Sequence, residues 1–151
     1  MLDYTIYFGA DHRGFEKKAE LIKLVQGCHD FLKVEDIWPA EYNPDDDFND
    51  AALQVAEKVL ADEHGFGVLL CGSAHGVCMQ ANRIKGIRAI YARTPESAAI
   101  GREHDYANVL CFSADEMDPA TMEPIVKAFC HARPNPDERY RRRVERLDQE
   151  G

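Results

Sequence analysis

The stretch from Phe66 to Asn82 constrains the fold most, because a continuous apolar run there ends abruptly in a glycine-bracketed turn. The apolar residues 66–70 are typical of a strand buried on both faces of a sheet. Gly72 and Gly76 allow a tight turn, and a helix is expected to start at about Gly76 or Val77. Free amides at a helix start favour negative charge, so this loop is a predicted seat for an anion or a developing oxyanion.

Cys71 lies at the edge of the predicted loop, where a thiol would be chemically useful. Thiols beside helix N-termini lose their protons more readily than free thiols do, which suits a base or a nucleophile. A purely structural role is the alternative, since unpaired cysteines are among the most buried residues. The position of Cys71 is therefore compatible with catalysis and with simple packing at a strand end.

Two other patterns raise the question of metal binding. Cys71, His75 and Cys78 have a spacing found in parts of zinc sites, but no fourth ligand is evident. The acidic run 45–47 lacks the regular oxygen spacing of a calcium loop and is better interpreted as a solvated loop. We therefore predict no metal site.

Strands and helices alternate along the chain. Strands are expected at 4–10, 34–38, 66–70, 87–92 and 108–112. Helices are expected at 15–25, ending before Gly27, and at 48–59, 77–84, 95–104 and 119–131. This order predicts one α/β domain over residues 1–151, a three-layer, doubly wound (Rossmann-like) fold around a five-stranded parallel sheet. No G-x-G-x-x-G follows the first strand, which disfavours a dinucleotide-binding fold.

The tail is expected to form a polar helix over about 137–150. Its apolar stripe of Tyr140, Val144 and Leu147 is narrow and suits docking on another subunit. Arg139 and Arg143 are four residues apart and share a face, where together they would grip a phosphate. The alternative is a solvated arginine face paired with the acidic residues of the same helix.

Composition narrows the possible partners and the compartment. The 45% hydrophobic content excludes general disorder, and the net charge of -9 argues against nucleic-acid and membrane-surface binding. No signal peptide or transmembrane run is visible, so we expect a cytoplasmic protein. An odd number of irregularly spaced cysteines favours reduced thiols over a disulfide framework. The five are Cys28, Cys71, Cys78, Cys111 and Cys130.

Four motifs occur in one order along the chain. Asp11-His12 follows the first strand, Cys71-Gly72-Ser73-x-x-Gly76 follows the third, and A-N-R-I-K-G-I-R-A and R-E-H-D-Y-A-N-V-L occupy 81–89 and 102–110. Together they resemble the ribose-5-phosphate isomerase type B family, which includes the galactose-6-phosphate isomerase subunits. The resemblance extends from about Ile6 to Leu147.

The resemblance implies an aldose-ketose isomerase that needs no metal or other cofactor and works as a homodimer or tetramer. Cys71 corresponds to the acid/base group, and Ser73 to the hydroxyl that moves a proton between the two sugar oxygens. His104 corresponds to a histidine that assists ring opening, with Asp11 at the ring oxygen. The family site is completed across the dimer interface.

The same resemblance implies how the substrate is bound. Main-chain amides of the loop Gly72 to Gly76, which includes Ala74 and His75, would stabilise the enediolate. The phosphate would be held by His12, Arg139 and Arg143. Asp105, which follows His104, replaces a common asparagine and would repel an anion if it faced the site. Ala74 replaces a loop glycine and would be strained if it needs positive φ.

Asp115 bears on the identity of the substrate, because many members carry a phosphate-contacting arginine near this position. Because an aspartate stands here instead, the phosphate would be held by Arg13 or Arg93, or the sugar would differ. Ribose 5-phosphate is the expected substrate. The alternatives are galactose 6-phosphate, allose 6-phosphate, a tetrose phosphate or an unphosphorylated sugar, and a non-catalytic sugar-phosphate binding protein on the same fold.

Overall fold

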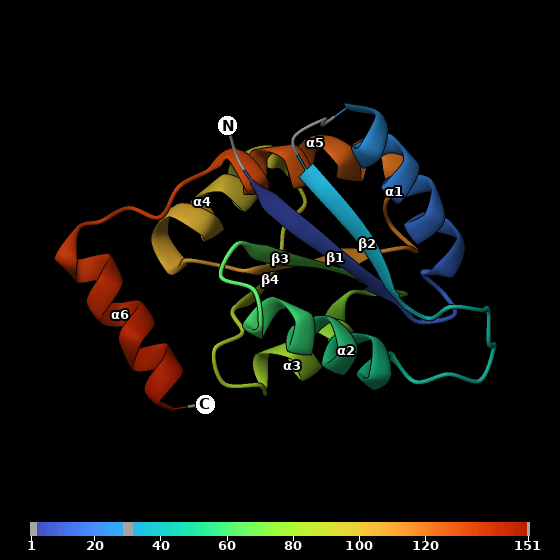
Figure 1. The fold of residues 1–151 in the computed structure, drawn as a ribbon, viewed down its shortest axis with the longest axis horizontal. Coiled ribbons are helices and arrows are strands. Elements are labelled where there is room, and N and C mark those ends of the chain that lie inside the picture. Colours follow the sequence, from blue (N-terminus) through green and yellow to red (C-terminus); the bar gives the residue numbers. More distant parts are fainter. Residues whose placement is uncertain (1–2, 29–31, 151) are drawn as a thin grey trace.

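A computed structural model describes residues 3–28 and 32–150 (Figure 1). The strands are β1 (Tyr4–Ala10), β2 (Leu32–Trp38), β3 (Gly65–Cys71), β4 (Ala89–Tyr91) and β5 (Val109–Ser113). The helices are α1 (Phe15–Cys28), α2 (Phe48–Leu60), α3 (His75–Asn82), α4 (Pro95–Asp105), α5 (Pro119–His131) and α6 (Glu138–Gln149). All strand pairs are parallel in the order β2-β1-β3-β5-β4, which confirms the predicted five-stranded doubly wound α/β fold.

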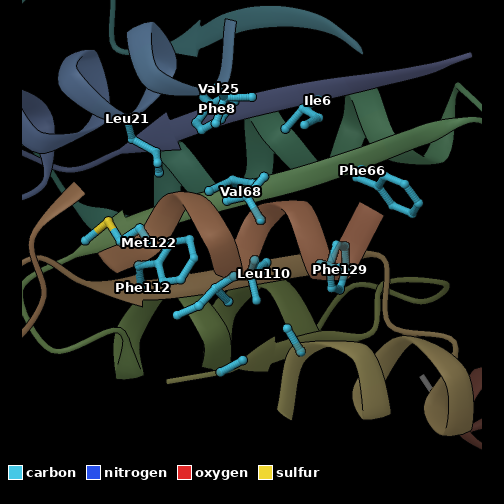
Figure 2. Packing of buried hydrophobic residues seen from close by; sticks show 14 of the residues in the cluster. Ile6, Phe8, Leu21, Val25, Phe66, Val68, Leu110, Phe112, Met122 and Phe129 are labelled. Atoms are coloured by element: carbon cyan, nitrogen blue, oxygen red, sulfur yellow. The ribbon is translucent and has the colours of Figure 1, made fainter. Parts of the chain in front are cut away.

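The sheet separates two apolar clusters, and strand alternation decides which residues enter each. Ile6 and Phe8 of β1 pack with Leu21 of α1, Phe129 of α5 and other residues on one face (Figure 2). Leu69 and neighbouring strand residues pack with α2 and α3 on the other face. All seven residues of β3 are buried, as expected for a central strand covered on both sides.

Local signals explain most element boundaries. Thr94 caps α4 as predicted, since its hydroxyl oxygen accepts a hydrogen bond from the Ser97 amide at 3.1 Å and Pro95 follows. Several predicted boundaries were wrong. Strand β4, expected at 87–92, covers only Ala89–Tyr91, and α3 ends at Asn82 instead of about 84. Gly27 does not end α1, which continues to Cys28 because burial of residues such as Val25 outweighs the cost of one exposed glycine. α3 begins at His75, one or two residues earlier than predicted.

The chain reverses its direction of winding between β1 and β3. β1 leads into α1 on one face of the sheet, whereas β3 leads into α3 on the other face. Adjacent parallel strands whose connections diverge in this way leave a crevice beyond their carboxyl ends, where ligands bind in open α/β sheets. The loops after Ala10 and Cys71 border this crevice.

Helix α6 stands apart from the layers and lies beside α4 (Figure 1). Arg88, just before β4, forms an ion pair with Asp148 at 3.0 Å, and the Asn135 amide donates to the Glu103 carbonyl at 2.8 Å. Within α6, which the structure describes throughout, Val144 alone is buried. In the described part of the chain, no helix is long and apolar enough to cross a membrane.

Candidate active site

The loop after β3 is braced by the end of β5. The amides of Ala114 and Asp115 donate to the carbonyls of Cys71 and Gly72 at 2.9 and 3.0 Å. The buried Ser113 hydroxyl donates to the same Gly72 carbonyl at 2.7 Å. Because these carbonyls are occupied, the loop is held as a continuation of the sheet and Cys71 is fixed at its edge, 4% exposed.

Ala74, which replaces a loop glycine, adopts the left-handed conformation that is strained for a residue with a side chain. Its φ is 72° and its side chain is fully buried. This conformation costs a residue with a Cβ about 1–2 kcal/mol relative to a right-handed one. The Ser73 hydroxyl oxygen accepts a bond from the His75 amide at 3.3 Å, at the start of α3. The loop therefore turns into a helix as predicted, with a methyl group in place of a hydrogen atom.

Asp11 lies on the other side of the crevice. Its amide donates to the Leu70 carbonyl at 3.2 Å, one residue before Cys71. Its carboxylate accepts bonds from the amides of Arg13 at 3.0 Å and Gly14 at 3.2 Å, and the residue is 6% exposed. Burial raises the pKa of Asp11, and the two amide bonds oppose this effect. Asp11 is therefore an oriented acidic group beside Cys71.

His12 is held by a buried carboxylate. Its amide and its Nδ1 both lie 2.9 Å from Oδ1 of Asp46, whose side chain is 6% exposed. The hydrogen bond to Asp46 raises the pKa of His12, and burial opposes it. The interpretation of 45–47 as a plain solvated loop was thus wrong for Asp46, which turns inward to pair with His12. This pairing favours the cationic form of His12 beside the crevice.

The pH dependence of substrate affinity tests this pairing. If His12 contacts the phosphate, KM should rise as pH increases through the raised pKa, because the positive charge is present below that pKa and lost above it. Asp46→Asn should bring the rise to lower pH. KM measured between about pH 5 and pH 9 checks this expectation. Asp45→Asn, at an exposed neighbouring residue, is the control. If the two variants gave the same dependence of KM on pH, the pairing of His12 with Asp46 would not control substrate affinity.

His104, Asp105, Arg139 and Arg143 lie at the opposite edge of the sheet. His104 and Asp105 end α4, just before β5, and α6 is fastened to Arg88 in front of β4. In a parallel sheet these are amino ends, whereas Asp11 and Cys71 stand at carboxyl ends. A seven-residue strand such as β3 spans about 20 Å, so one chain does not bring the two groups together.

Several side chains at the amino ends of the strands contact one another. The His104 and Tyr140 rings are stacked, with centroids 4.7 Å apart and an interplanar angle of 9°. The Arg139 guanidinium lies 5.4 Å from the centre of the Tyr140 ring and 3.4 Å from the Asp137 carboxylate. Arg143 is exposed and borders a hollow of about 230 Å³ with Arg146, Leu147 and Glu150. His104 stacks on the tail helix at this edge, where Arg139 and Arg142 of that helix pair with Asp137 and Glu138, as in the alternative of an arginine face paired with nearby acids.

The thiols are free where their side chains are described. These are Cys71, Cys78, Cys111 and Cys130, and the Cys28 side chain lies outside the described residues. A hydrogen bond with Cys111 lowers the pKa of Cys78 to about 7, with burial opposing it. Within residues 3–28 and 32–150, no three His, Cys, Asp or Glu side chains lie close enough together to hold a metal ion.

Several residues at these two edges escaped sequence interpretation. Ser113 and Tyr140 have no local signature of their contacts, and Asp46 meets His12 across 34 positions of sequence. Asp115, which stands where the resemblance led us to expect a phosphate-contacting arginine, forms an ion pair with Arg13. Of the two arginines considered as substitutes at this end, Arg13 lies against the loop and Arg93 pairs with Glu116 at 3.7 Å.

Comparison with known proteins places this geometry in a family. The ribose/galactose isomerase family model matches residues 6–147. The probable ribose-5-phosphate isomerase B of Mycoplasma pneumoniae is 39% identical, over 87% of this chain and 85% of that protein. The Escherichia coli ribose-5-phosphate isomerase B is 34% identical, over 94% and 93% respectively.

Solved structures agree over nearly the whole chain. The type B ribose 5-phosphate isomerase of Trypanosoma brucei superimposes with a TM-score of 0.91 at 29% identity, covering 98% of this chain and 99% of that one. The isomerase B of Mycoplasma genitalium with bound ribulose-5-phosphate gives 0.88 at 30% identity, covering 99% and 97%. The chain therefore belongs to the ribose/galactose isomerase family, among the sugar-phosphate isomerases of the ribose-5-phosphate isomerase B type.

Proposed function

We propose that this protein interconverts ribose 5-phosphate and ribulose 5-phosphate. The observation that carries the proposal is the meeting of Cys71, Asp11 and the loop 72–76 at the carboxyl edge of β1 and β3. A relative with the same fold has been solved with ribulose-5-phosphate bound, which supports this substrate for a chain of closely similar backbone.

The chemistry requires a proton to move between neighbouring carbons. The Cys71 thiolate removes the proton from C2 of the open-chain aldose, and the electron pair moves to form an enediolate. Amides of the loop 72–76 would stabilise the negative oxygen, as donors aimed at a developing charge do. Ser73 moves a proton from O2 to O1, and the proton on Cys71 is delivered to C1. No electron leaves the substrate, so no redox cofactor is required.

The remaining groups come from two chains in this proposal. Asp11 and His12 belong to the same half-site as Cys71 and would contact the ring oxygen and the phosphate. His104, Arg139 and Arg143 lie about a strand length away on the same chain, so a partner subunit would supply them. The protein would then be an obligate dimer with a cationic partner surface covering each crevice.

A substrate panel tests the proposed activity. Ribose 5-phosphate should be converted fastest among ribose 5-phosphate, allose 6-phosphate, galactose 6-phosphate and erythrose 4-phosphate, with free ribose much slower. The reaction in deuterated water should place deuterium on the reacting carbons, because the transferred proton exchanges with solvent on Cys71. Kinetic assays and NMR of the products measure the two results.

Each other outcome would change the assignment. Faster turnover of another sugar phosphate would reassign the substrate within the same reaction class. Binding without turnover or deuterium incorporation would replace the isomerase with a sugar-phosphate binding protein. Turnover of free sugars alone would remove the role of the arginines as phosphate ligands.

A further inference from the structure

The Arg13 side chain bridges two loops that are far apart in sequence. Its amide is fixed by the Asp11 carboxylate at 3.0 Å, directly after β1. Its Nη2 donates to Oδ2 of Asp115, in the loop after β5 and 102 residues away. The arginine therefore spans the edge of the sheet in front of β3, which lies between these two strands.

The guanidinium lies directly over Gly72. A Cβ built on Gly72 would stand 2.5 Å from Cζ of Arg13, so the guanidinium occupies the space that a side chain at this position would need. The Asp115 amide donates to the Gly72 carbonyl at 3.0 Å, which ties both partners of the ion pair to the same residue. A positive charge is thereby placed one residue beyond Cys71.

Stability does not explain this arrangement. The Arg13 and Asp115 side chains are 55% and 45% exposed, and ion pairs of such exposure contribute little to folding. A guanidinium carries five N–H donors, and the bond to Asp115 uses only Nη2. The donors that remain are available to a ligand in the crevice.

Arg13 also shares a cavity with His12. The cavity measures about 600 Å³, enough for a sugar phosphate, and is lined by His12, Arg13, Phe15, Glu16, Lys17 and Tyr42. The bond to Asp46 favours the cationic form of His12, so a guanidinium and an imidazole lie side by side in a cavity that Glu16 and Lys17 also line. Such a pair recognises a phosphate, because guanidinium groups match its geometry and charge.

We propose that Arg13, held in position by Asp115, binds the phosphate from the same chain as Cys71 and selects phosphorylated over free sugars. This inference rests on the proposed isomerase function and adds a specificity-determining residue to it. Asp115 acts through Arg13 and is a positioning residue.

Arg13→Ala tests the proposal through the split between KM and kcat. KM for ribose 5-phosphate should rise about tenfold or more, as expected for the loss of a charged hydrogen bond, while kcat changes less. The inhibition constant of inorganic phosphate should rise by a similar factor. Slow turnover of free ribose should stay unchanged. Arg13→Lys should recover part of the affinity, because it keeps the charge and loses the planar fork.

Arg93→Ala is the matched control, since Arg93 is an exposed arginine paired with Glu116 that does not lie over Gly72. The charge swap Arg13→Asp with Asp115→Arg returns a guanidinium from the opposite side of Gly72, and it should recover phosphate affinity that Arg13→Asp alone loses. Equal effects of Arg13→Ala and Arg93→Ala on KM and on phosphate inhibition would overturn the proposal. An equal loss on free ribose would do the same, by showing a general structural role.

Calorimetric binding of inorganic phosphate separates this inference from the proposed function. If the wild-type protein isomerises no sugar but Arg13→Ala still weakens phosphate binding about tenfold, the function fails and the role of Arg13 stands. If the wild-type protein is active and Arg13→Ala binds phosphate as Arg93→Ala does, the function stands and the role of Arg13 fails.

Discussion

Replacing Cys71 with alanine should lower kcat for ribose 5-phosphate by about two orders of magnitude or more, the range typical of a lost acid/base group. Cys71 ends the fully buried strand β3 and borders the loop whose amides would hold the enediolate. Removal of one sulfur atom leaves these amides in place, so substrate binding should change little. Steady-state kinetics and deuterium incorporation at C2 measure the two effects.

Cys130→Ala is the matched control for this variant. Cys130 is also buried, at 1% exposure, but it lies in the cluster on the opposite face of the sheet with α5. It should lose a similar amount of stability and keep its turnover. Full activity in Cys71→Ala would assign the base to another residue, with the exposed His75 as the nearest candidate in the loop.

Mixing two inactive variants should restore activity if each site is shared between two chains. Cys71→Ala disables one half-site, and the double variant Arg139→Ala, Arg143→Ala disables the other. Random pairing makes half of the dimers mixed, and one of the two sites in each mixed dimer is intact. Activity should therefore return from about one per cent or less to about a quarter of the wild-type value.

Coexpression with two different purification tags isolates the mixed dimer, which should show about half of the wild-type activity because one of its two sites is intact. Pairing Cys71→Ala with His12→Ala provides the control, because both changes fall at the same edge of the sheet and no mixed dimer has an intact site. If activity recovered in this control, coexpression itself would raise the activity of the variants, and the recovery in the first pair would not show complementation. If the first pair stays inactive, or an active monomer sediments, the shared site is excluded.

Local sequence patterns were sufficient for the order of the elements and for the turn at residues 72–76. The apolar run 66–70, the glycines of the loop and the Thr94-Pro95 cap each act over a few residues, so the sequence alone predicts their structure. The alternation of strands and helices then predicts a parallel sheet, because consecutive parallel strands need crossovers. The loops after β1 and β3 were expected at the carboxyl edge for the same reason.

Local sequence patterns did not predict the contacts between segments that are far apart in the sequence. Asp46 resembled the other acids of its loop, and nothing near it in sequence marks a bond with His12. Asp115 was interpreted only as the loss of an arginine, because its partner, Arg13, lies 102 residues away. The exact end of α1 also escaped prediction, since tertiary burial of Val25 outweighed the propensity of Gly27.

The attachment of α6 has a consequence for local unfolding. Opening β3 would break its ladders to both β1 and β5, so the segment with Cys71 opens only when the whole sheet melts. Helix α6 buries Val144 alone, and its few contacts are with α4 and its neighbours, so in an isolated chain it detaches at much lower cost. Folding of the single chain therefore holds Arg139 and Arg143 only loosely, and in the proposed dimer the partner subunit would decide how firmly they are held.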